Sequence, residues 1–230
     1  MPSSRRSAVL IGVLLVATFF LGCRTTRPTR SVEPSGFLGD YSQLEEGSWG
    51  EAQLVYINEG TDFSTYDSIW LESVEFWASE ETAKVPKEDR QALTDKLYTV
   101  LRDEFSKDYK LALEPGPGVM RVRAAITDAK GSMVVLNTVT TAIPQTRAAS
   151  TLLGLATDTA LFVGRAGIEV ELADSVTGER LAAAVDQRAG TKTLRGGLRE
   201  WSHVHRSFEH WGERFHERLA ELRETTARSQ

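Results

Sequence analysis

The chain has 230 residues and is mildly acidic, with 27 lysines and arginines against 32 aspartates and glutamates, a net charge of −5. A protein with this charge balance and no basic stripe is a poor candidate for binding nucleic acid. Cys23 is the only cysteine, so the chain cannot form an internal disulfide. Its stability is expected to come from an apolar core.

The N-terminal residues have the parts of a secretory signal peptide. Arg5 and Arg6 form a basic region, and an apolar run over residues 8–21 ends just before Cys23. The run is about 14 residues long, whereas a membrane-spanning helix needs roughly 20. Polar and basic residues follow it. We therefore expect residues 1–22 to be removed as a lipoprotein signal peptide, and the loss of two arginines takes the net charge from −5 to −7.

The end of this run, Phe20-Leu21-Gly22-Cys23, looks like a bacterial lipobox, in which a cysteine after a small residue is acylated and becomes the new N-terminus. Phe20 stands where leucine is usual. Acyl chains such as palmitate bind membranes with about 0.8 kcal/mol per buried methylene, and more than one chain anchors stably. We predict Cys23 as the lipidation site. The alternatives are an ordinary signal peptide and a short N-terminal anchor.

The residues around the cysteine also bear on location. Arg24 stands where lipoproteins of the inner membrane often have aspartate, so the resemblance implies the outer membrane, with the protein facing the periplasm. Arg5-Arg6 faintly resembles a twin-arginine signal, but Ser7-Ala8-Val9 fits that pattern poorly. The general secretion route is favoured.

The rest of the chain is expected to form one domain. Residues 23–34, with the lipidated cysteine, are predicted to be a flexible tether because they are rich in Thr, Arg, Pro and Ser. Residues 35–224 have the length of a single domain, and residues 225–230 are predicted to be a disordered tail. After the tether comes an apolar patch that we expect to pin the domain's start onto its core, a partner-binding peptide being the alternative. The patch comprises Phe37, Leu38, Tyr41 and Leu44.

A strand and a helix are predicted next. Residues 66–77 alternate as a strand whose apolar phase changes near Ser73, which a β-bulge would explain. Pro86 opens a helix with acidic residues in its first turn, and the helix is expected to end near Tyr109. Its apolar face is predicted to be Leu93, Leu97, Val100, Leu101 and Phe105.

Residues 119–127 are predicted to form a second strand. Met120, Val122, Ala124 and Ile126 are expected to be buried, while Arg121 and Arg123 face water and residues 128–131 end the strand. Residues 133–163 are less distinct. We expect an extended segment and then a short helix over residues 148–159, with a lobe that contacts a membrane, a partner or another copy as the alternative.

The final elements have the strongest patterns. Residues 168–172 and 181–185 alternate on either side of a turn that begins at Asp174 and contains Gly178, which predicts a β-hairpin. After Gly196-Gly197 comes a long amphipathic helix expected to lie across the sheet. Its apolar stripe is predicted to be Leu198, Trp201, Val204, Phe208, Trp211, Phe215, Leu219 and Leu222.

The fold class that follows is α+β, a mainly antiparallel sheet with two long helices packed on it, in the order strand, helix, strand, hairpin, helix. Several short motifs, in their order, resemble a family of bacterial lipoproteins known as domain of unknown function 3313. They are Ser35-Gly36-Phe37-Leu38, Tyr41-Ser42 with Leu44, Ile143-Pro144, Phe162-Val163-Gly164, Ile168-Glu169, Asp174-x-x-Thr177-Gly178-Glu179 and Trp201. The resemblance implies an envelope location and supplies no activity.

No pattern in the chain favours a catalytic or cofactor site over a structural explanation. The four histidines, His203, His205, His210 and His216, lack the i, i+4 spacing of two zinc ligands, so we expect them to be solvated or at the rim of the core. Gly116-Pro117-Gly118 and Gly196-Gly197 lack the spacing of phosphate-binding loops, and Ser150 and Ser202 lack a nucleophile elbow. Asp174 and Glu179 are expected to solvate a turn, and Trp201 and Trp211 to belong to the core.

These patterns predict a non-enzymatic cell-envelope lipoprotein with no cofactor and no metal. It would contact the membrane through Cys23 and act as a binding or assembly module, with an envelope protein or a second copy of itself as partner. The alternative is a small-ligand binder or hydrolase with a pocket between the sheet and residues 133–163.

Overall fold

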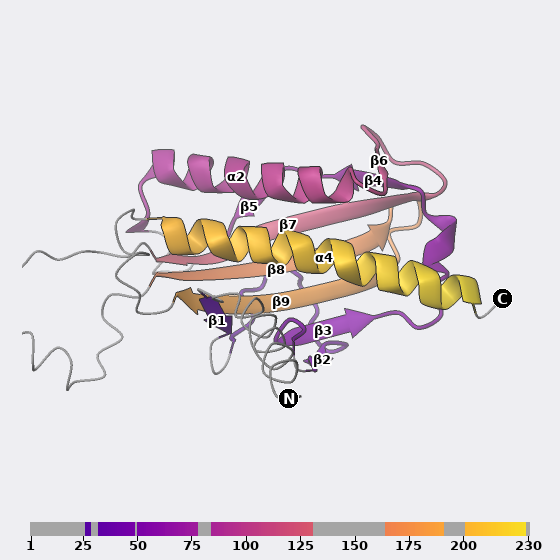
Figure 1. Cartoon of the computed structure of the whole chain (residues 1–230), viewed down its shortest axis with the longest axis horizontal. Coiled ribbons are helices and arrows are strands. Elements are labelled where there is room, and N and C mark those ends of the chain that lie inside the picture. The colour runs from indigo at the N-terminus through magenta and orange to yellow at the C-terminus, as the bar shows by residue number, and fades with distance from the viewer. Residues whose placement is uncertain are drawn as a thin grey trace, which may run out of the picture.

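The computed structural model describes residues 26–28, 32–48, 50–77, 84–130, 164–190 and 201–228. Within these ranges a nine-stranded sheet carries two long helices (Figure 1). In chain order the elements are β1 (Thr26–Pro28), β2 (Glu45–Glu46), β3 (Leu54–Ile57), the 3-10 helix η1 (Phe63–Thr65), β4 (Ser68–Leu71), β5 (Glu75–Phe76), α2 (Lys87–Phe105), β6 (Lys110–Leu111), β7 (Val119–Lys130), β8 (Arg165–Asp174), β9 (Arg180–Gly190) and α4 (Ser202–Arg228).

The sheet has the order β2-β3-β9-β8-β7-β4-β6, with β1 also paired to β9 and β5 also paired to β7. The pairings are antiparallel except along one side, where β4 runs parallel to β7 and to β6, and β5 runs parallel to β7. Parallel neighbours need a long crossover, and α2 supplies it between β4 and β7. The predicted α+β class and the order of its main elements are confirmed; β1, β2, β3 and β6 are additional.

The predicted hairpin is β8 and β9, which pair antiparallel over most of their length. Asp174 forms the turn as expected, because its Oδ1 accepts hydrogen bonds from the backbone amides of Val176 (3.0 Å) and Thr177 (2.7 Å). Gly178 has φ +74°, a left-handed conformation that glycine adopts without steric cost.

The predicted change of phase near Ser73 is confirmed. Leu71 pairs with Val122 and Glu75 pairs with Ala125, so three residues between β4 and β5 lie opposite two residues of β7. The extra residue lets apolar side chains on either side of the break face the same core.

A second irregularity was not predicted. Leu172 pairs with Ala182 and Ala173 pairs with Arg180, which leaves Leu181 as an extra residue in β9. Leu181 therefore packs in the core under the helices, whereas Ala183 and Val185 pack on the opposite face of the sheet. The expectation that these three residues share one alternating face was wrong, because a bulge shifts the phase by one residue.

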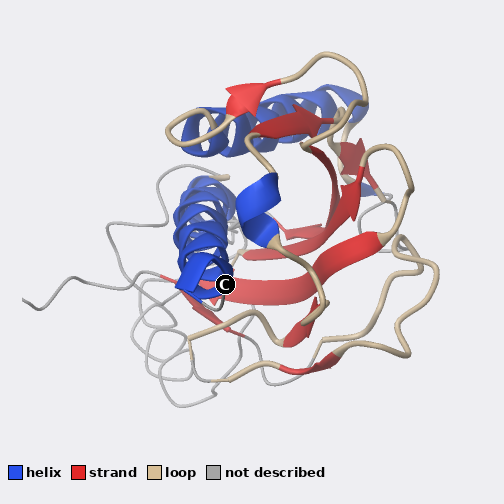
Figure 2. Ribbon diagram, turned by 90° about the vertical axis from the view of Figure 1, so that its right-hand side faces the viewer, coloured by secondary structure: helices blue, strands red, loops and turns tan. Residues whose placement is uncertain are grey.

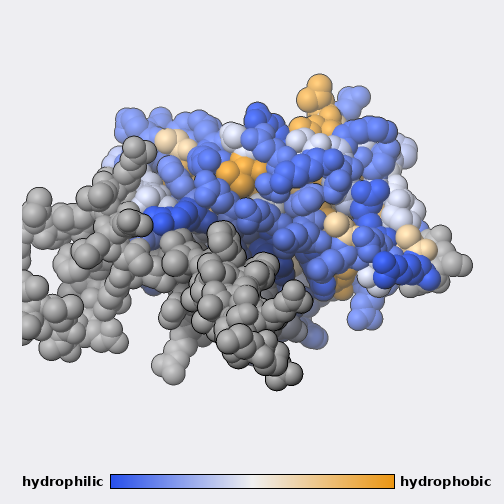
Figure 3. All heavy atoms as spheres, in the orientation of Figure 1, coloured by the Kyte–Doolittle hydropathy of each residue, from blue (hydrophilic) through white to orange (hydrophobic). Residues whose placement is uncertain are grey.

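Both helices cover the same face of a curved sheet (Figure 2). The apolar face of α2 is as predicted, with Val100 at its edge, but the helix ends at Phe105 rather than near Tyr109. It ends earlier because the following residues turn back to form β6. Gly212 of α4 is the point of close approach, since a Cβ there would lie 2.6 Å from Cγ1 of Val100. The outer surface of the helices is largely hydrophilic (Figure 3), so their apolar stripes face the sheet.

The other face of the sheet is covered by the segment that follows the tether. Phe37 and Leu38 are buried against Ala125, Ala183 and Val185, and Tyr41 and Leu44 pack around them. The prediction that this apolar patch pins the start of the domain is confirmed. Sequence alone did not indicate that it covers a face of its own, opposite the helices.

Four further expectations differ from the structure. β7 continues to Lys130, three residues beyond its expected end at residue 127, because β8 pairs with it as far as Arg165. Residues 26–28 of the expected tether form β1, which pairs with the part of β9 that extends beyond β3. In the expected tail, α4 runs to Arg228, where an ion pair of 3.0 Å with Glu224 supports the last turn. The arginines of β7 are half-buried rather than solvated.

Residues 1–25, including Cys23, and residues 131–163 lie outside the described part of the chain, so the predictions made for them stay predictions. Among the helices that are described, none combines the length and the apolar character needed to cross a bilayer.

Candidate functional site

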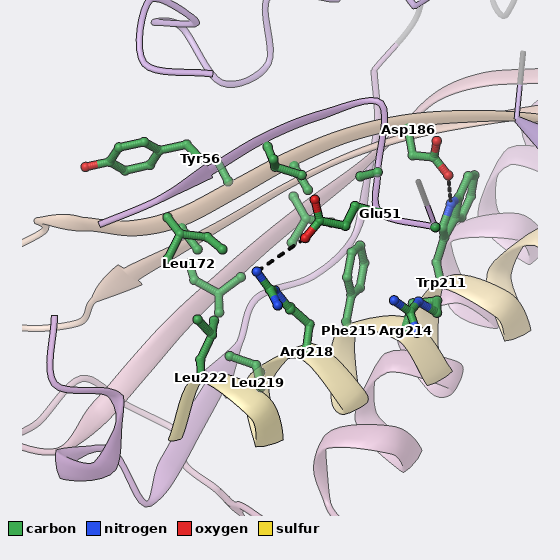
Figure 4. A pocket seen from close by; sticks show the side chains of 18 of the residues that line it. Glu51, Tyr56, Leu172, Asp186, Trp211, Arg214, Phe215, Arg218, Leu219 and Leu222 are labelled. Carbon is green, nitrogen blue, oxygen red and sulfur yellow. Dashed lines mark hydrogen bonds and ion pairs between the residues drawn. The ribbon is translucent and has the colours of Figure 1, made fainter. Parts of the chain in front are cut away.

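A groove lies between α4 and the β3–β9 side of the sheet, with a cavity of about 100 Å³. Its lining is mostly apolar (Figure 4). We call it the α4 groove. Its principal lining residues are Glu51, Val55, Ile57, Val170, Leu172, Ala182, Ala184, Asp186, His210, Trp211, Arg214, Phe215, Arg218, Leu219 and Leu222.

The groove exists because small side chains of β9 lie under a helix with large ones. In the sheet register, Ala184 lies between Val170 of β8 and Val55 of β3, so these side chains share the face that α4 covers. Ala182 occupies the same face one pair further along, and both alanines are only half-buried. A methyl group cannot fill the distance to the aromatic stripe of α4, which leaves an apolar floor accessible from outside.

Charged side chains border the opening. Arg214 and Arg218 are four residues apart on α4 and therefore lie on the same side of the helix. Arg218 reaches across the groove to Glu51, and its Nη2 lies 3.2 Å from the Oε1 of that glutamate (Figure 4). This ion pair links α4 to the loop between β2 and β3.

At the other end of the groove lies a buried acid. Asp186 is 3% exposed, and the indole Nε1 of Trp211 donates a hydrogen bond to its Oδ2 at 2.6 Å. Burial raises the pKa of Asp186, while the Trp211 bond and the nearby Arg188 act in the opposite direction. Trp211 is thereby fixed in the core, as predicted, and Trp201 packs at the edge of the core.

A second constellation, on the opposite face of the sheet, joins several of the family-like motifs. Glu169 of β8 is fully buried; its Oε1 accepts a hydrogen bond from the backbone amide of Ser35 (2.7 Å), and its Oε2 accepts one from the hydroxyl of Tyr41 (2.5 Å). The Tyr41 oxygen also accepts hydrogen bonds from the amides of Gly36 and Leu38. We call this arrangement the Glu169 clamp. Burial, followed by the bond to Glu169, raises the pKa of Tyr41.

Ion pairs extend the clamp along the sheet. Nε of Arg180 donates to Glu171 at 2.8 Å, and its two terminal nitrogens donate to the backbone carbonyls of Asp40 and Leu38. The guanidinium of Arg123 lies 3.3 Å from Glu171 and stacks on the ring of Phe37 at 4.8 Å. Glu171 is thus compensated by two arginines, while Glu169 is satisfied by hydrogen bonds, and the clamp holds the N-terminal segment on the sheet.

The histidines are not brought together. His216 lies 2.6 Å from Asp108 and joins α4 to the end of α2, while His210 lines the α4 groove. His205 is half-buried against Phe208. Across the described ranges there is no group of three or more histidine, cysteine or acidic side chains that could hold a metal ion.

His203 corrects one expectation. It was predicted to be solvated or at the rim of the core, yet it is 4% exposed, and its Nδ1 has no hydrogen-bond partner among the described residues. Burial lowers the pKa of His203, and the nearby charge of Arg206 lowers it further. A neutral imidazole tolerates burial, which explains how a histidine occupies this position.

The remaining candidates have structural roles or lie outside the description. Oδ2 of Asp174 accepts a hydrogen bond from Tyr66 at 3.0 Å, and Glu179 accepts one from the side chain of Asn58 at 2.9 Å, so both acids stabilise the hairpin tip. Burial and the Asp174 bond raise the pKa of Tyr66 to about 12. Gly118 forms a turn with φ +71°. Ser150 and the pair at 196–197 are not among the described residues.

Sequence reasoning missed the groove residues Arg214, Arg218, Glu51 and Asp186. The signal for them was indirect. The run Leu181-Ala182-Ala183-Ala184 places small residues on a strand that faces a helix with a large aromatic stripe. Such a mismatch in side-chain size predicts unfilled space, but only once the helix is known to lie over that strand.

Comparison with known proteins gives a family and distant structural likenesses. The chain resembles the PelC dodecamer from Paraburkholderia phytofirmans, with 13% sequence identity and a TM-score of 0.38 over 67% of this chain and 91% of that one. A single-substitution variant of the same PelC gives 14% identity and a TM-score of 0.38 over 67% and 90%. No curated protein matches the chain. Residues 33–215 match the family model described as "Protein of unknown function (DUF3313)", and the chain belongs to that family.

Proposed function

We propose that this protein is a lipid-anchored module of the bacterial cell envelope that acts by binding rather than by catalysis. In this proposal Cys23 carries the acyl chains, and the domain faces the periplasm from the outer membrane. The apolar run of signal-peptide length that ends at Cys23 supports the location.

The observation that carries the binding role is the α4 groove. It offers an apolar floor bordered by a few charged groups, which is the usual composition of a site for a small molecule or a partner's side chain. Outside it, the acids at the hairpin tip and in the Glu169 clamp already accept hydrogen bonds that hold the fold together.

The fold also supports a closely held domain. Two residues separate Cys23 from β1, and a residue spans at most about 3.6 Å, so an anchor at Cys23 would hold that end of the sheet within roughly 10 Å of the membrane surface. The Glu169 clamp then fixes the following segment to the sheet. A partner would meet a domain held close to the membrane rather than one at the end of a long flexible tether.

Fractionation of cells tests the location. The wild-type protein is expected in the outer membrane, and Cys23→Ser is expected to leave it and to remain unprocessed. Arg24→Asp is the matched control, because it keeps the cysteine and is expected to move the protein to the inner membrane. Unchanged processing and fractionation of Cys23→Ser would refute the anchor.

Affinity purification from solubilised envelopes tests the binding role. A bound protein, lipid or small molecule is expected with the wild type and is expected to be reduced by Ala184→Leu, which fills the groove. Recovery of nothing, together with turnover of a defined envelope substrate by the purified protein, would contradict a binding module and favour the hydrolase alternative. The groove, which lies between α4 and the β3–β9 side of the sheet, favours the small-ligand part of that alternative.

A further inference from the structure

The α4 groove has the form of a site for an elongated apolar group. Its lining on α4 extends from His210 to Leu222, and a helical rise of about 1.5 Å per residue gives this lining a length of about 18 Å. Phe215 and Leu219 form one wall between these ends. A chain lying along the groove would contact apolar atoms over this length.

The charges at the opening are unevenly divided. Arg214 and Arg218 place two guanidinium groups at the lip formed by α4, and Glu51 is the acidic side chain among the lining residues of the facing lip. The other carboxylates that pair with the arginines, Glu217 and Glu221, are more than half exposed and are not part of the lining. Exposed pairs of this kind contribute little to stability, so a bound anion can compete for the same guanidinium donors.

The buried end of the groove holds an ion pair, since Nη1 of Arg188 lies 3.8 Å from Oδ2 of Asp186, and Trp211 donates a hydrogen bond to the same oxygen. This end therefore offers a charged head group no free partner of opposite sign. An amphiphile with an anionic head would therefore place the head at the two arginines and its chain on the alanine floor. A cationic amphiphile would meet two like charges at the same lip.

We propose that the α4 groove binds a medium-chain fatty acid, with its alkyl chain along Ala182 and Ala184 and its carboxylate between Arg214 and Arg218. This inference rests on the proposed binding function and names its ligand class. Burial of the chain supplies the affinity, since apolar surface leaves water. The arginines supply selectivity, because a guanidinium matches a carboxylate with two parallel hydrogen bonds.

Calorimetric titration of the full-length chain carrying Cys23→Ser, which has no acyl chain of its own, tests the ligand class. The probes are laurate, the alcohol of the same chain length and the matching alkylammonium. Laurate is expected to bind about tenfold more tightly than the alcohol, and the alkylammonium more weakly than both. Equal binding of laurate and the alkylammonium, or no binding of laurate, would overturn the proposal.

Variants separate head-group recognition from chain burial. Arg214→Gln with Arg218→Gln is expected to abolish the preference for laurate over the alcohol while binding of the alcohol persists. Arg228→Gln, an exposed arginine at the end of α4, is the control and is expected to keep the preference. Ala184→Leu is expected to weaken both ligands by about tenfold.

The test remains decisive if Ala184→Leu unfolds, because the arginine variants are at the surface. A preference for laurate that survives their loss would refute the site. Failure of this inference is also distinguishable from failure of the proposed function. If laurate does not bind but affinity purification from solubilised envelopes recovers a bound molecule that Ala184→Leu reduces, only the ligand is wrong.

Discussion

At the scale of single residues, two carboxylates differ in whether their role could be predicted from nearby residues in the sequence. Glu169 is buried and satisfied by donors 134 and 128 residues away in the chain, so no local pattern predicts its role. Its neighbours in sequence indicate only an alternating strand. Asp174, by contrast, accepts hydrogen bonds from residues two and three positions later, and its role in the turn could be predicted from the sequence.

Replacing Glu169 tests the clamp. Glu169→Ala leaves the hydroxyl of Tyr41 and the amide of Ser35 without their acceptor, so the free energy of unfolding is expected to fall by roughly 2–4 kcal/mol. Chemical denaturation measures it. Glu45→Ala, an exposed glutamate of β2, is the control, with an expected change within about 0.5 kcal/mol. Tyr41→Phe should cost less in the Glu169→Ala background than in the wild type, and additive costs would contradict the clamp.

The pH dependence of stability tests Asp174. The hydrogen bond from the backbone amide of Thr177 holds the pKa of Asp174 below its ordinary value of 3.8. As the pH falls below that value, the unfolded state takes up the proton first, so the stabilisation is present above the unfolded pKa and is lost as the pH falls through the folded one. Asp174→Asn is therefore expected to be less stable than the wild type at neutral pH, with a difference that disappears in acid. Denaturation curves at several pH values measure it, and a constant difference would contradict this.

At the scale of elements, strong local periodicity separates what could be predicted from what could not. The hairpin, the two helices and the bulge near Ser73 follow from spacing within a few residues. β3 could not be predicted in this way, because Leu54-Val55-Tyr56-Ile57 is a continuous apolar run that is compatible with either a strand or a buried helix segment. The shift of phase at Leu181 also escaped prediction, since a bulge depends on the partner strand.

The contact between the helices provides a test at this scale. Gly212→Ala brings a Cβ against Val100, and overpacking of about 1–3 kcal/mol outweighs the gain of about 1 kcal/mol in helix propensity. A net loss of about 1 kcal/mol in the free energy of unfolding is expected from chemical denaturation. In a chain that also carries Val100→Ala, the same glycine substitution should become neutral or stabilising. If it destabilises both backgrounds equally, the two helices do not meet at this glycine.

At the scale of the whole molecule, the sheet places the proposed anchor and the hairpin tip at opposite ends. β1 pairs with Arg188 to Gly190 at one end of β9, and the turn that contains Asp174 precedes its other end. Eleven residues of strand, at about 3.4 Å each, separate these ends by roughly 35 Å. An anchor at Cys23 would therefore allow the hairpin tip to stand up to roughly 35 Å farther from the membrane than β1, with the α4 groove between them.

The proposals for location and for function rest on the sequence to different degrees. The apolar run and the cysteine indicate an anchor because signal recognition depends on a short local pattern. The α4 groove depends on which strand lies under which helix, and nothing in the linear order of residues shows that. A binding role could therefore be proposed from the sequence only as a class, and the surface that would carry it could not be identified.

The central claim is that Cys23 becomes an acylated N-terminus, and the intact mass of the protein extracted from outer membranes tests it most directly. We predict a chain that begins at Cys23, lacks residues 1–22 and carries the added mass of acyl groups on that cysteine. A chain that retains residues 1–22, or one that begins elsewhere with an unmodified mass, would contradict it.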